Sequence, residues 1–239
     1  MALLTDSEIR QAVEEGEIEI EPLGPESVQP ASYDLRLGEK AIVTRTLEID
    51  KVRERVEQDE AQETDVAEAG SISIPAGAFA LIVTRERVRF GAQYAGHLGL
   101  RSYFARKGVL LLSGLQVDPG FEGYLVLGFA NVSPRSVHIS YEEAVATLEI
   151  QRLNRPAAEP YSGVYAGQQT SPEIPRADAD YLRTIETLSV SDLTRALLRL
   201  SDNVSELSND VGQLARYVKV VWIPVAIAVL VALVTVFFN

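Results

Sequence analysis

The sequence of 239 residues contains no cysteine and only two histidines, His97 and His138. Without cysteine the chain can form neither disulfides nor thiolate metal sites, and two histidines are too few for a histidine-based zinc site. These absences exclude the zinc-dependent nucleobase deaminases, whose metal is held by His and Cys ligands. We therefore expect no zinc, and we assign the two histidines no role.

Positive charge is also scarce, with 22 Lys and Arg against 34 Asp and Glu and a net charge of −12. No stretch is basic along its length, whereas binding to a phosphate backbone requires clustered Lys and Arg. We therefore expect no nucleic-acid partner, and the acidic balance is more typical of solubility. The opening stretch "MALLTDSEIRQAVEEG" has neither a basic start nor an apolar run, so it does not predict a signal peptide.

The hydrophobic content of 46% is enough for a full core. Residues 5–16 predict a short helix, which Thr5 or Asp6 can cap and Gly16 can end. From about residue 30 to 155, short apolar runs are broken by Gly, Pro and Asn, a spacing that predicts an all-β barrel or a jelly-roll-like domain. Residues 51–70 are charged and predict a surface excursion, and residues 155–181 predict a tail without regular structure.

A heptad pattern follows a predicted linker at residues 176–190. Apolar residues recur at alternating spacings of four and three, at Leu193, Leu197, Leu200, Val204, Leu207, Val211, Leu214 and Val218. This alternation favours a coiled-coil stalk over residues 191–219, and the alternative is an amphipathic helix packed on the β domain. Val at one seam position with Leu at the other favours a two-stranded coiled coil.

Residues 220–238 carry no charge. Nineteen helical residues span roughly 28 Å, close to the hydrocarbon core of a bilayer. We therefore predict a single-pass transmembrane anchor, so that the membrane is a partner. Arg216 and Lys219 flank its N-terminal side and no charge follows it, which predicts that the head lies in the cytoplasm.

Three stretches are unusual for ordinary strands: "QPASYDLRLG" (29–38), "LRSYFARKG" (100–108) and "VDPGFEG" (117–123). In this order they resemble the dCTP deaminase and dUTPase superfamily, the deaminase branch most closely, over residues 1 to about 175. The resemblance implies a dUTPase-like β-clip head, a distorted β-barrel that assembles as a homotrimer. It also implies pyrimidine deoxynucleotide sites between subunits, with Mg²⁺ bound through the triphosphate and no zinc.

The resemblance assigns roles to individual residues. Arg101, Ser102 and Arg106 match the motif that gathers phosphates, and a planar guanidinium pairs well with phosphate oxygens. Asp118 matches the aspartate beside the sugar and is the candidate catalytic residue; Gln116 joins the nucleotide-binding set. The alternative roles are surface ion pairs for the arginines and a turn cap for Asp118.

Further matches surround this motif. Phe121 matches the aromatic residue against the deoxyribose, with core packing as its alternative. Tyr161 and Gln168 match tail positions that fold over the nucleotide. The stretch Ser32, Tyr33 and Asp34 is expected to support the fold rather than the chemistry.

The departures from the deaminase pattern concern the chemistry itself. In deaminases the strand after the "DPGF" turn carries the catalytic glutamate, and Gly128 stands at that position here. Tyr103 replaces a serine of the phosphate motif, and Ser113 and Gly114 only approximately replace the stretch before the aspartate. Val164 stands where a basic residue often precedes the tail tyrosine. Glu122 is the nearest carboxylate in sequence, and its alternative is an exposed turn residue.

Three functions remain open. The first is an enzyme that hydrolyses or deaminates a pyrimidine deoxynucleoside triphosphate. The second is a catalytically inactive, membrane-anchored nucleotide sensor or regulator, and the third is a purely structural trimer. The interface between heads would be much larger than the interface between stalks. We therefore expect the three-fold symmetry of the head to determine the assembly, although the stalk sequence favours a two-stranded coiled coil.

Overall fold

The computed structural model describes residues 2–46, 63–163, 171–184, 186–187 and 190–237. Contacts divide the chain into a unit from Met1 to Ser191, called the head here, and a unit from Asp192 to Asn239. Each unit is described by itself.

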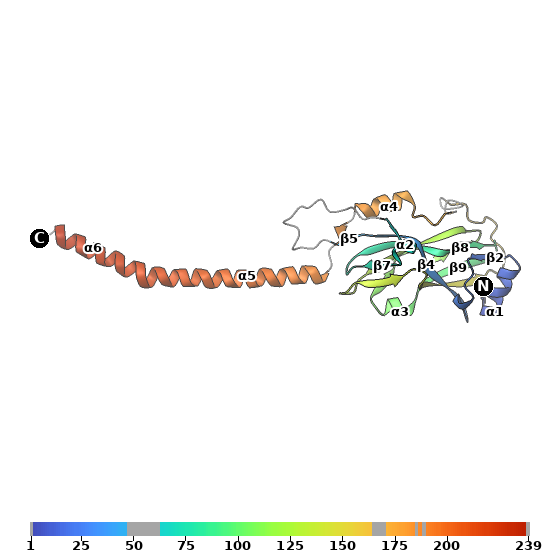
Figure 1. Ribbon diagram of the computed structural model, residues 1–239, viewed down its shortest axis with the longest axis horizontal. Coiled ribbons are helices and arrows are strands. Elements are labelled where there is room, and N and C mark those ends of the chain that lie inside the picture. Colours follow the sequence, from blue (N-terminus) through green and yellow to red (C-terminus); the bar gives the residue numbers. More distant parts are fainter. Residues whose placement is uncertain (1, 47–62, 164–170, 185, 188–189, 238–239) are drawn as a thin grey trace. The chain divides into compact units, whose positions relative to one another are not determined.

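In its described residues the head consists mainly of strands (Figure 1), with four short α-helices and a 3-10 helix at Pro25–Ser27. The strands are β1 (Ala2–Leu3), β2 (Ile18–Glu21), β3 (Val28–Gln29), β4 (Ser32–Val43), β5 (Arg45–Thr46), β6 (Glu63–Asp65), β7 (Ser71–Ile74), β8 (Phe79–Phe90), β9 (Tyr94–Leu100), β10 (Val109–Leu111), β11 (Gln116–Val117), β12 (Glu122–Asn131), β13 (Val137–Ser140), β14 (Ala144–Arg152) and β15 (Glu186–Thr187). The helices are α1 (Asp6–Glu14), α2 (Val66–Ala69), α3 (Ser102–Ala105) and α4 (Arg176–Arg183).

Among the described residues, eleven strands form one sheet, whose main path runs β10-β12-β8-β4-β14-β9-β11. Two smaller pairs join β13 to β7 and β15 to β5. The central strand β8 alternates between apolar residues that face the core, such as Ile82 and Val88, and arginines that face outward, such as Arg87 and Arg89. The prediction of a mainly β head is therefore confirmed.

One ion pair lies inside the sheet. Glu86 of β8 is fully buried, and its carboxylate accepts hydrogen bonds from the Arg36 side chain at 2.6 Å and the Arg36 backbone N–H at 2.9 Å. Burial raises the pKa of Glu86 above its ordinary value, although the arginine opposes this effect. The pair thus satisfies a buried charge and supports the fold.

The predicted N-terminal helix is confirmed as α1. The backbone N–H of Thr5 donates to the Glu8 carboxylate at 2.9 Å, which lowers the pKa of Glu8. After the helix, Gly16 adopts a positive φ of 71°, a conformation that favours glycine and ends the helix.

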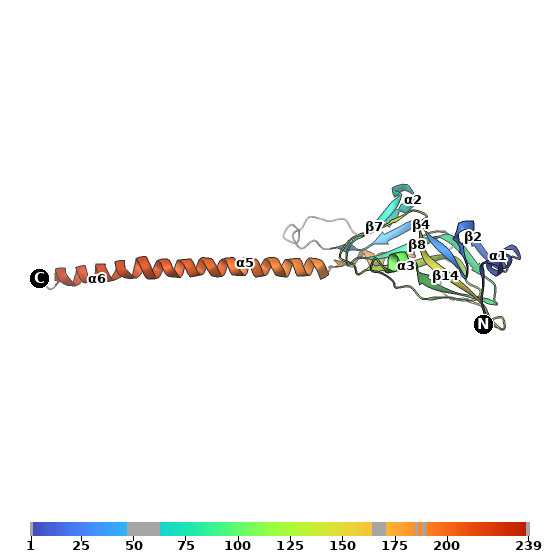
Figure 2. The same cartoon turned by 90° about the horizontal axis from the view of Figure 1, so that it is seen from below.

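The charged segment predicted as a surface excursion contains two short elements in its described part. Residues 63–65 form β6 against β4. Helix α2 lies beside β7 (Figure 2), and its Val66 side chain is buried. Residues 47–62, the rest of the predicted excursion, lie outside the described residues.

One prediction is wrong, and it concerns the C-terminal end of the head. Residues 176–183, predicted as tail and linker, form helix α4. Its Ala179 and Leu182 are buried against Ile42 of β4 and Val83 of β8. Ala179 and Leu182 are three residues apart and so share one face of the helix, which is enough to dock it although the local composition is polar.

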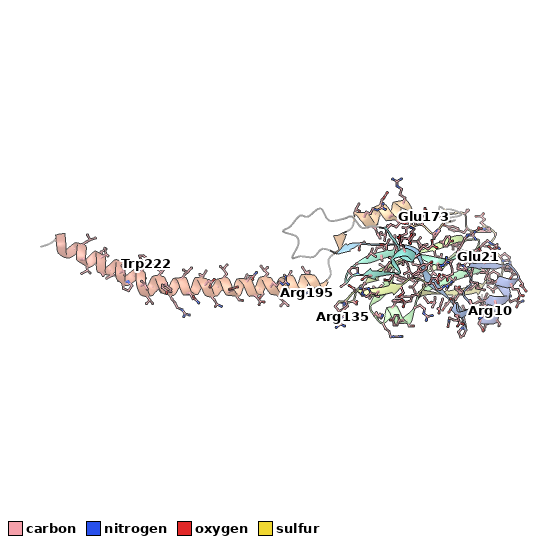
Figure 3. The ribbon with its side chains drawn as sticks, viewed as in Figure 1. Arg10, Glu21, Arg135, Glu173, Arg195 and Trp222 are labelled. Carbon is pink, nitrogen blue, oxygen red and sulfur yellow. The ribbon has the colours of Figure 1, made fainter. Side chains whose placement is uncertain are left out.

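The C-terminal unit is helical in its described part. Helix α5 (Val190–Tyr217) is followed by a π-helical turn (Val218–Trp222) and by α6 (Ile223–Phe237). Side chains such as Arg195 and Trp222 project from this helix (Figure 3), and the seam residue Leu207 is 64% exposed. The helix from Leu193 to Val234 is long and apolar enough to cross a membrane, judged by its length and composition.

Candidate functional site

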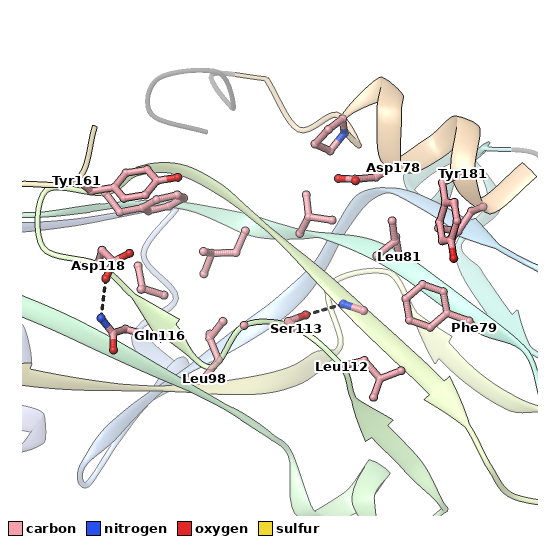
Figure 4. Close-up of a pocket in the computed structure, with 18 residues that line it drawn as sticks. Phe79, Leu81, Leu98, Leu112, Ser113, Gln116, Asp118, Tyr161, Asp178 and Tyr181 are labelled. Atoms are coloured by element: carbon pink, nitrogen blue, oxygen red, sulfur yellow. Dashed lines mark hydrogen bonds between the residues drawn. The ribbon is translucent and has the colours of Figure 1, made fainter. Parts of the chain in front are cut away.

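A cavity of about 550 Å³ opens in the head between β8, β12, the β10–β11 connection and α4 (Figure 4). Eighteen residues line it: Phe79, Leu81, Leu98, Leu112, Ser113, Gly114, Gln116, Val117, Asp118, Phe121, Leu125, Val126, Gly128, Tyr161, Pro175, Asp178, Tyr181 and Leu182. Its wall is mostly apolar with a few polar groups, a composition typical of small-molecule sites.

One end of the cavity is built by the turn that follows β11. The Gln116 side-chain amide donates to Asp118 Oδ1 at 2.6 Å, as the dashed line in Figure 4 shows. The Phe121 ring, 9% exposed, lies 5.9 Å from the Tyr161 ring between centroids. Gln116 and the two residues of the "VDPGFEG" stretch, Asp118 and Phe121, therefore meet Tyr161 of the predicted tail at one end of one cavity.

Gly120 allows the segment that carries Tyr161 to pack against the turn. Gly120 adopts φ +85°, and a Cβ at this position would lie 2.6 Å from the Pro160 side chain. The backbone N–H of Tyr161 donates to the Pro119 carbonyl at 2.7 Å. The segment before Tyr161 thus lies directly on the turn, because residue 120 has no side chain and can adopt the left-handed conformation.

Gly128 lies buried in the middle of β12 and lines the cavity. Its N–H donates to the Ser113 hydroxyl at 2.6 Å, and its carbonyl accepts from the Leu112 N–H at 2.8 Å. A Cβ at residue 128 would lie 3.0 and 3.1 Å from two ring carbons of Phe79. A side chain at position 128 would therefore require the Phe79 ring to shift by a few tenths of an ångström.

The predicted phosphate-binding motif lies on and beside α3, and none of its three residues lines the cavity within this chain. The Arg101 guanidinium forms an ion pair with Asp34, whose side chain is only 5% exposed. Ser102 and Arg106 are exposed. Tyr103, the residue that departs from the motif, accepts a hydrogen bond from Lys107 Nζ at 2.6 Å.

The remaining predicted residues fall elsewhere. Glu122 does not line the cavity, and its carboxylate pairs with Arg87 on the surface of the sheet. Tyr33 and Asp34 are buried. Gln168 and Val164 lie outside the described residues.

The charged residues that line the cavity are acidic. Among the described residues, its lining includes two carboxylates, Asp118 and Asp178, and no Lys or Arg. A triphosphate carries several negative charges, which these carboxylates would repel. The cavity of one chain therefore suits the uncharged nucleoside part of a nucleotide, and cations for its phosphates would have to come from elsewhere.

The sequence analysis missed the contribution of α4, which supplies Pro175, Asp178, Tyr181 and Leu182 to the cavity. A signal for this helix was present, since Pro175 precedes it and Asp178 lies in its first turn, both common at helix starts. Within the described part of the chain, no group of three or more His, Cys, Asp or Glu could hold a metal.

Comparison with known proteins places this cavity in context. Residues 3–153 match the family described as dCTP deaminase-like. The chain is 40% identical over 167 residues to a dCTP deaminase of Thermococcus sibiricus, covering 70% of this chain and 93% of the relative. It is 32% identical over 190 residues to a dCTP deaminase, dUMP-forming, of Methanobrevibacter smithii, covering 76% and 98%.

A solved structure of the 2'-deoxycytidine 5'-triphosphate deaminase from Agrobacterium tumefaciens is 22% identical, with a TM-score of 0.49. The similarity covers 62% of this chain and 47% of that one. Helices α4, α5 and α6 lie outside residues 3–153.

Proposed function

Because the chain belongs to the dCTP deaminase-like family, we propose that its cavity binds a pyrimidine deoxynucleoside triphosphate. The convergence of Gln116, Asp118, Phe121 and Tyr161 on one end of the cavity supports this proposal. In the proposed complex, the Asp118 carboxylate lies beside the sugar. The Phe121 ring packs against the deoxyribose and excludes a 2'-hydroxyl.

Two outcomes of binding are consistent with these residues. As a hydrolase, the chain would use Asp118 to accept a proton from a water that attacks the α-phosphorus. The products would be a nucleoside monophosphate and inorganic pyrophosphate. As a sensor, it would hold the nucleotide intact. The absence of a carboxylate at position 128 favours the sensor over a deaminase, and the Phe79 ring would have to shift to admit a side chain there.

Nucleotide binding should depend on Asp118 and not on its neighbour Glu122. In the full chain in detergent, with Mg²⁺, we expect dCTP or dUTP to raise the unfolding temperature more than UTP does. Asp118→Asn should lower the affinity for that nucleotide about tenfold or more, because a hydrogen bond to a charged group is lost. Glu122→Gln, which alters a carboxylate outside the cavity, should leave the affinity unchanged.

Chromatography of the same samples separates the two outcomes of binding. Conversion of dUTP to dUMP, or of dCTP to dUTP, that Asp118→Asn abolishes would identify an enzyme. A nucleotide that stabilises the chain and stays intact for hours would identify a sensor. Equal stabilisation of the wild type and Asp118→Asn by every nucleotide would contradict the proposed site.

We further propose that the site is completed in a homotrimer, with Arg101, Ser102 and Arg106 of one copy near the cavity of another. The absence of Lys and Arg among the described lining residues supports this assembly. Exposed apolar side chains near the cavity also support it, with Leu110 at 48%, Leu112 at 57% and Leu115 at 60%. The α5 helices would then form a three-stranded coiled coil.

The apolar segment 220–238 would anchor this trimer in a membrane, with the head in the cytoplasm. We expect the chain to remain in the membrane pellet after an alkaline wash, and detergent-extracted chain to have the mass of three copies by light scattering. Truncation after residue 219 should release it to the supernatant. Wild-type chain in the supernatant would contradict the anchor, and a mass of one or two copies would contradict the trimer.

A further inference from the structure

Helix α4 presents its two central acidic residues to different surroundings. Asp178 lines the cavity and is half-buried, whereas Asp180 is exposed. Asp180 pairs with Arg183 at 2.8 Å and with Arg176 at 3.7 Å. The buried side chain of Leu182 fixes the rotation of the helix, so that Asp178 faces the head.

The Asp178 carboxylate has no hydrogen-bond or ion-pair partner among the described residues. The cavity around it is largely apolar, and its described lining includes no Lys or Arg. A carboxylate only accepts hydrogen bonds, so a ligand that displaces water from this half-buried side chain must replace the lost bonds with a donor of its own. The cavity at Asp178 therefore favours a ligand that presents an N–H group to this side chain.

The position of Asp178 indicates which part of a nucleotide would reach it. In Figure 4, Asp118 and Gln116 lie at one end of the cavity and Asp178 and Tyr181 at the other, with Ser113 between them. In the proposed function the sugar lies at the Asp118 end, so the base extends past Gly128 towards α4. The apolar side chains in that direction suit the faces of a planar ring.

We propose that Asp178 determines which base the cavity accepts, by taking a hydrogen bond from the exocyclic amino group of cytosine. Uracil has a carbonyl oxygen at the corresponding position, which offers the carboxylate no donor and repels it. The residue lies outside the part of the chain that matches the family, residues 3–153, so this assignment depends on the cavity and on α4. It rests on the proposed nucleotide-binding function.

Binding of matched nucleotides tests the assignment. The full chain in detergent is titrated calorimetrically with the α,β-imido analogues of dCTP and dUTP, which cannot be hydrolysed at that bond. Asp178→Asn should weaken binding of the dCTP analogue about tenfold or more. The same variant should leave the affinity for the dUTP analogue unchanged or increase it, because the Asn amide can donate a hydrogen bond to the uracil carbonyl. Asp178→Glu, which keeps the acceptor, should retain the preference for cytosine.

Asp180→Asn is the matched control, since it removes the same charge from the same helix outside the cavity, and it should change neither affinity. Equal weakening of both analogues in Asp178→Asn, no change in either, or the same change in Asp180→Asn would overturn the assignment. A wild-type chain that binds neither analogue would instead refute the proposed function, and the assignment with it. The two failures are thus distinguishable.

Discussion

Replacing Arg101 with alanine should lower the free energy of unfolding by about 3 kcal/mol. The side chain of Asp34 is 5% exposed, and its ion pair is with Arg101. The other oxygen of this carboxylate, Oδ1, is buried and has no hydrogen-bond partner among the described residues. Removal of the guanidinium would therefore leave a nearly buried negative charge unpaired, which is among the costliest changes in a protein interior.

Two variants show whether this cost comes from Asp34. Arg106→Ala removes an exposed arginine from the same motif and should change stability by less than about 0.5 kcal/mol. The double variant Asp34→Asn with Arg101→Ala should recover much of the loss, because no unpaired charge remains. Chemical unfolding followed by circular dichroism gives all three values. Equal effects of the two single arginine variants would contradict a structural role for Arg101.

Replacing Gly128 with glutamate should destabilise the head by about 2 kcal/mol or more and should not produce deamination of dCTP. Its Cβ would approach the Phe79 ring to 3.0 Å, and the rest of the side chain would need the space that this ring fills. A glutamate at position 128 therefore requires the Phe79 ring to shift, and this shift is the expected source of the destabilisation.

Gly114→Glu provides the matched control for this prediction. It introduces the same side chain into the same cavity wall, at a position where an added Cβ meets nothing within 4 Å. It should be tolerated within about 0.5 kcal/mol. Phe79→Ala combined with Gly128→Glu should be less destabilising than the sum of the single variants, with a coupling of about 1 kcal/mol. Strict additivity would show that the ring and position 128 do not compete for space.

Much of the cavity could be predicted from motifs, because short motifs specify both a turn and the side chains on it. The "DPGF" stretch positions Asp118 and Phe121 together, and Gly120 in this stretch admits the segment that carries Tyr161. The position of Gly128 in the cavity was likewise predictable from its spacing after this turn.

Other features depended on contacts between residues distant in sequence. Phe79 is 49 residues from Gly128, and nothing in the pattern of β8 indicates which neighbour its ring will meet. The packing of α4 depends on Ile42 and Val83, which only the folded sheet brings together. The pairing of Arg101 with Asp34 is similarly a tertiary contact, so the motif alone indicated phosphate binding.

The shared use of α4 by the cavity and the core has a thermodynamic consequence. Because α4 supplies part of the cavity wall, a ligand that contacts this wall binds more tightly when the helix is docked. Docking and binding are then linked reciprocally: ligand stabilises the docked helix by the same free energy by which docking strengthens the ligand.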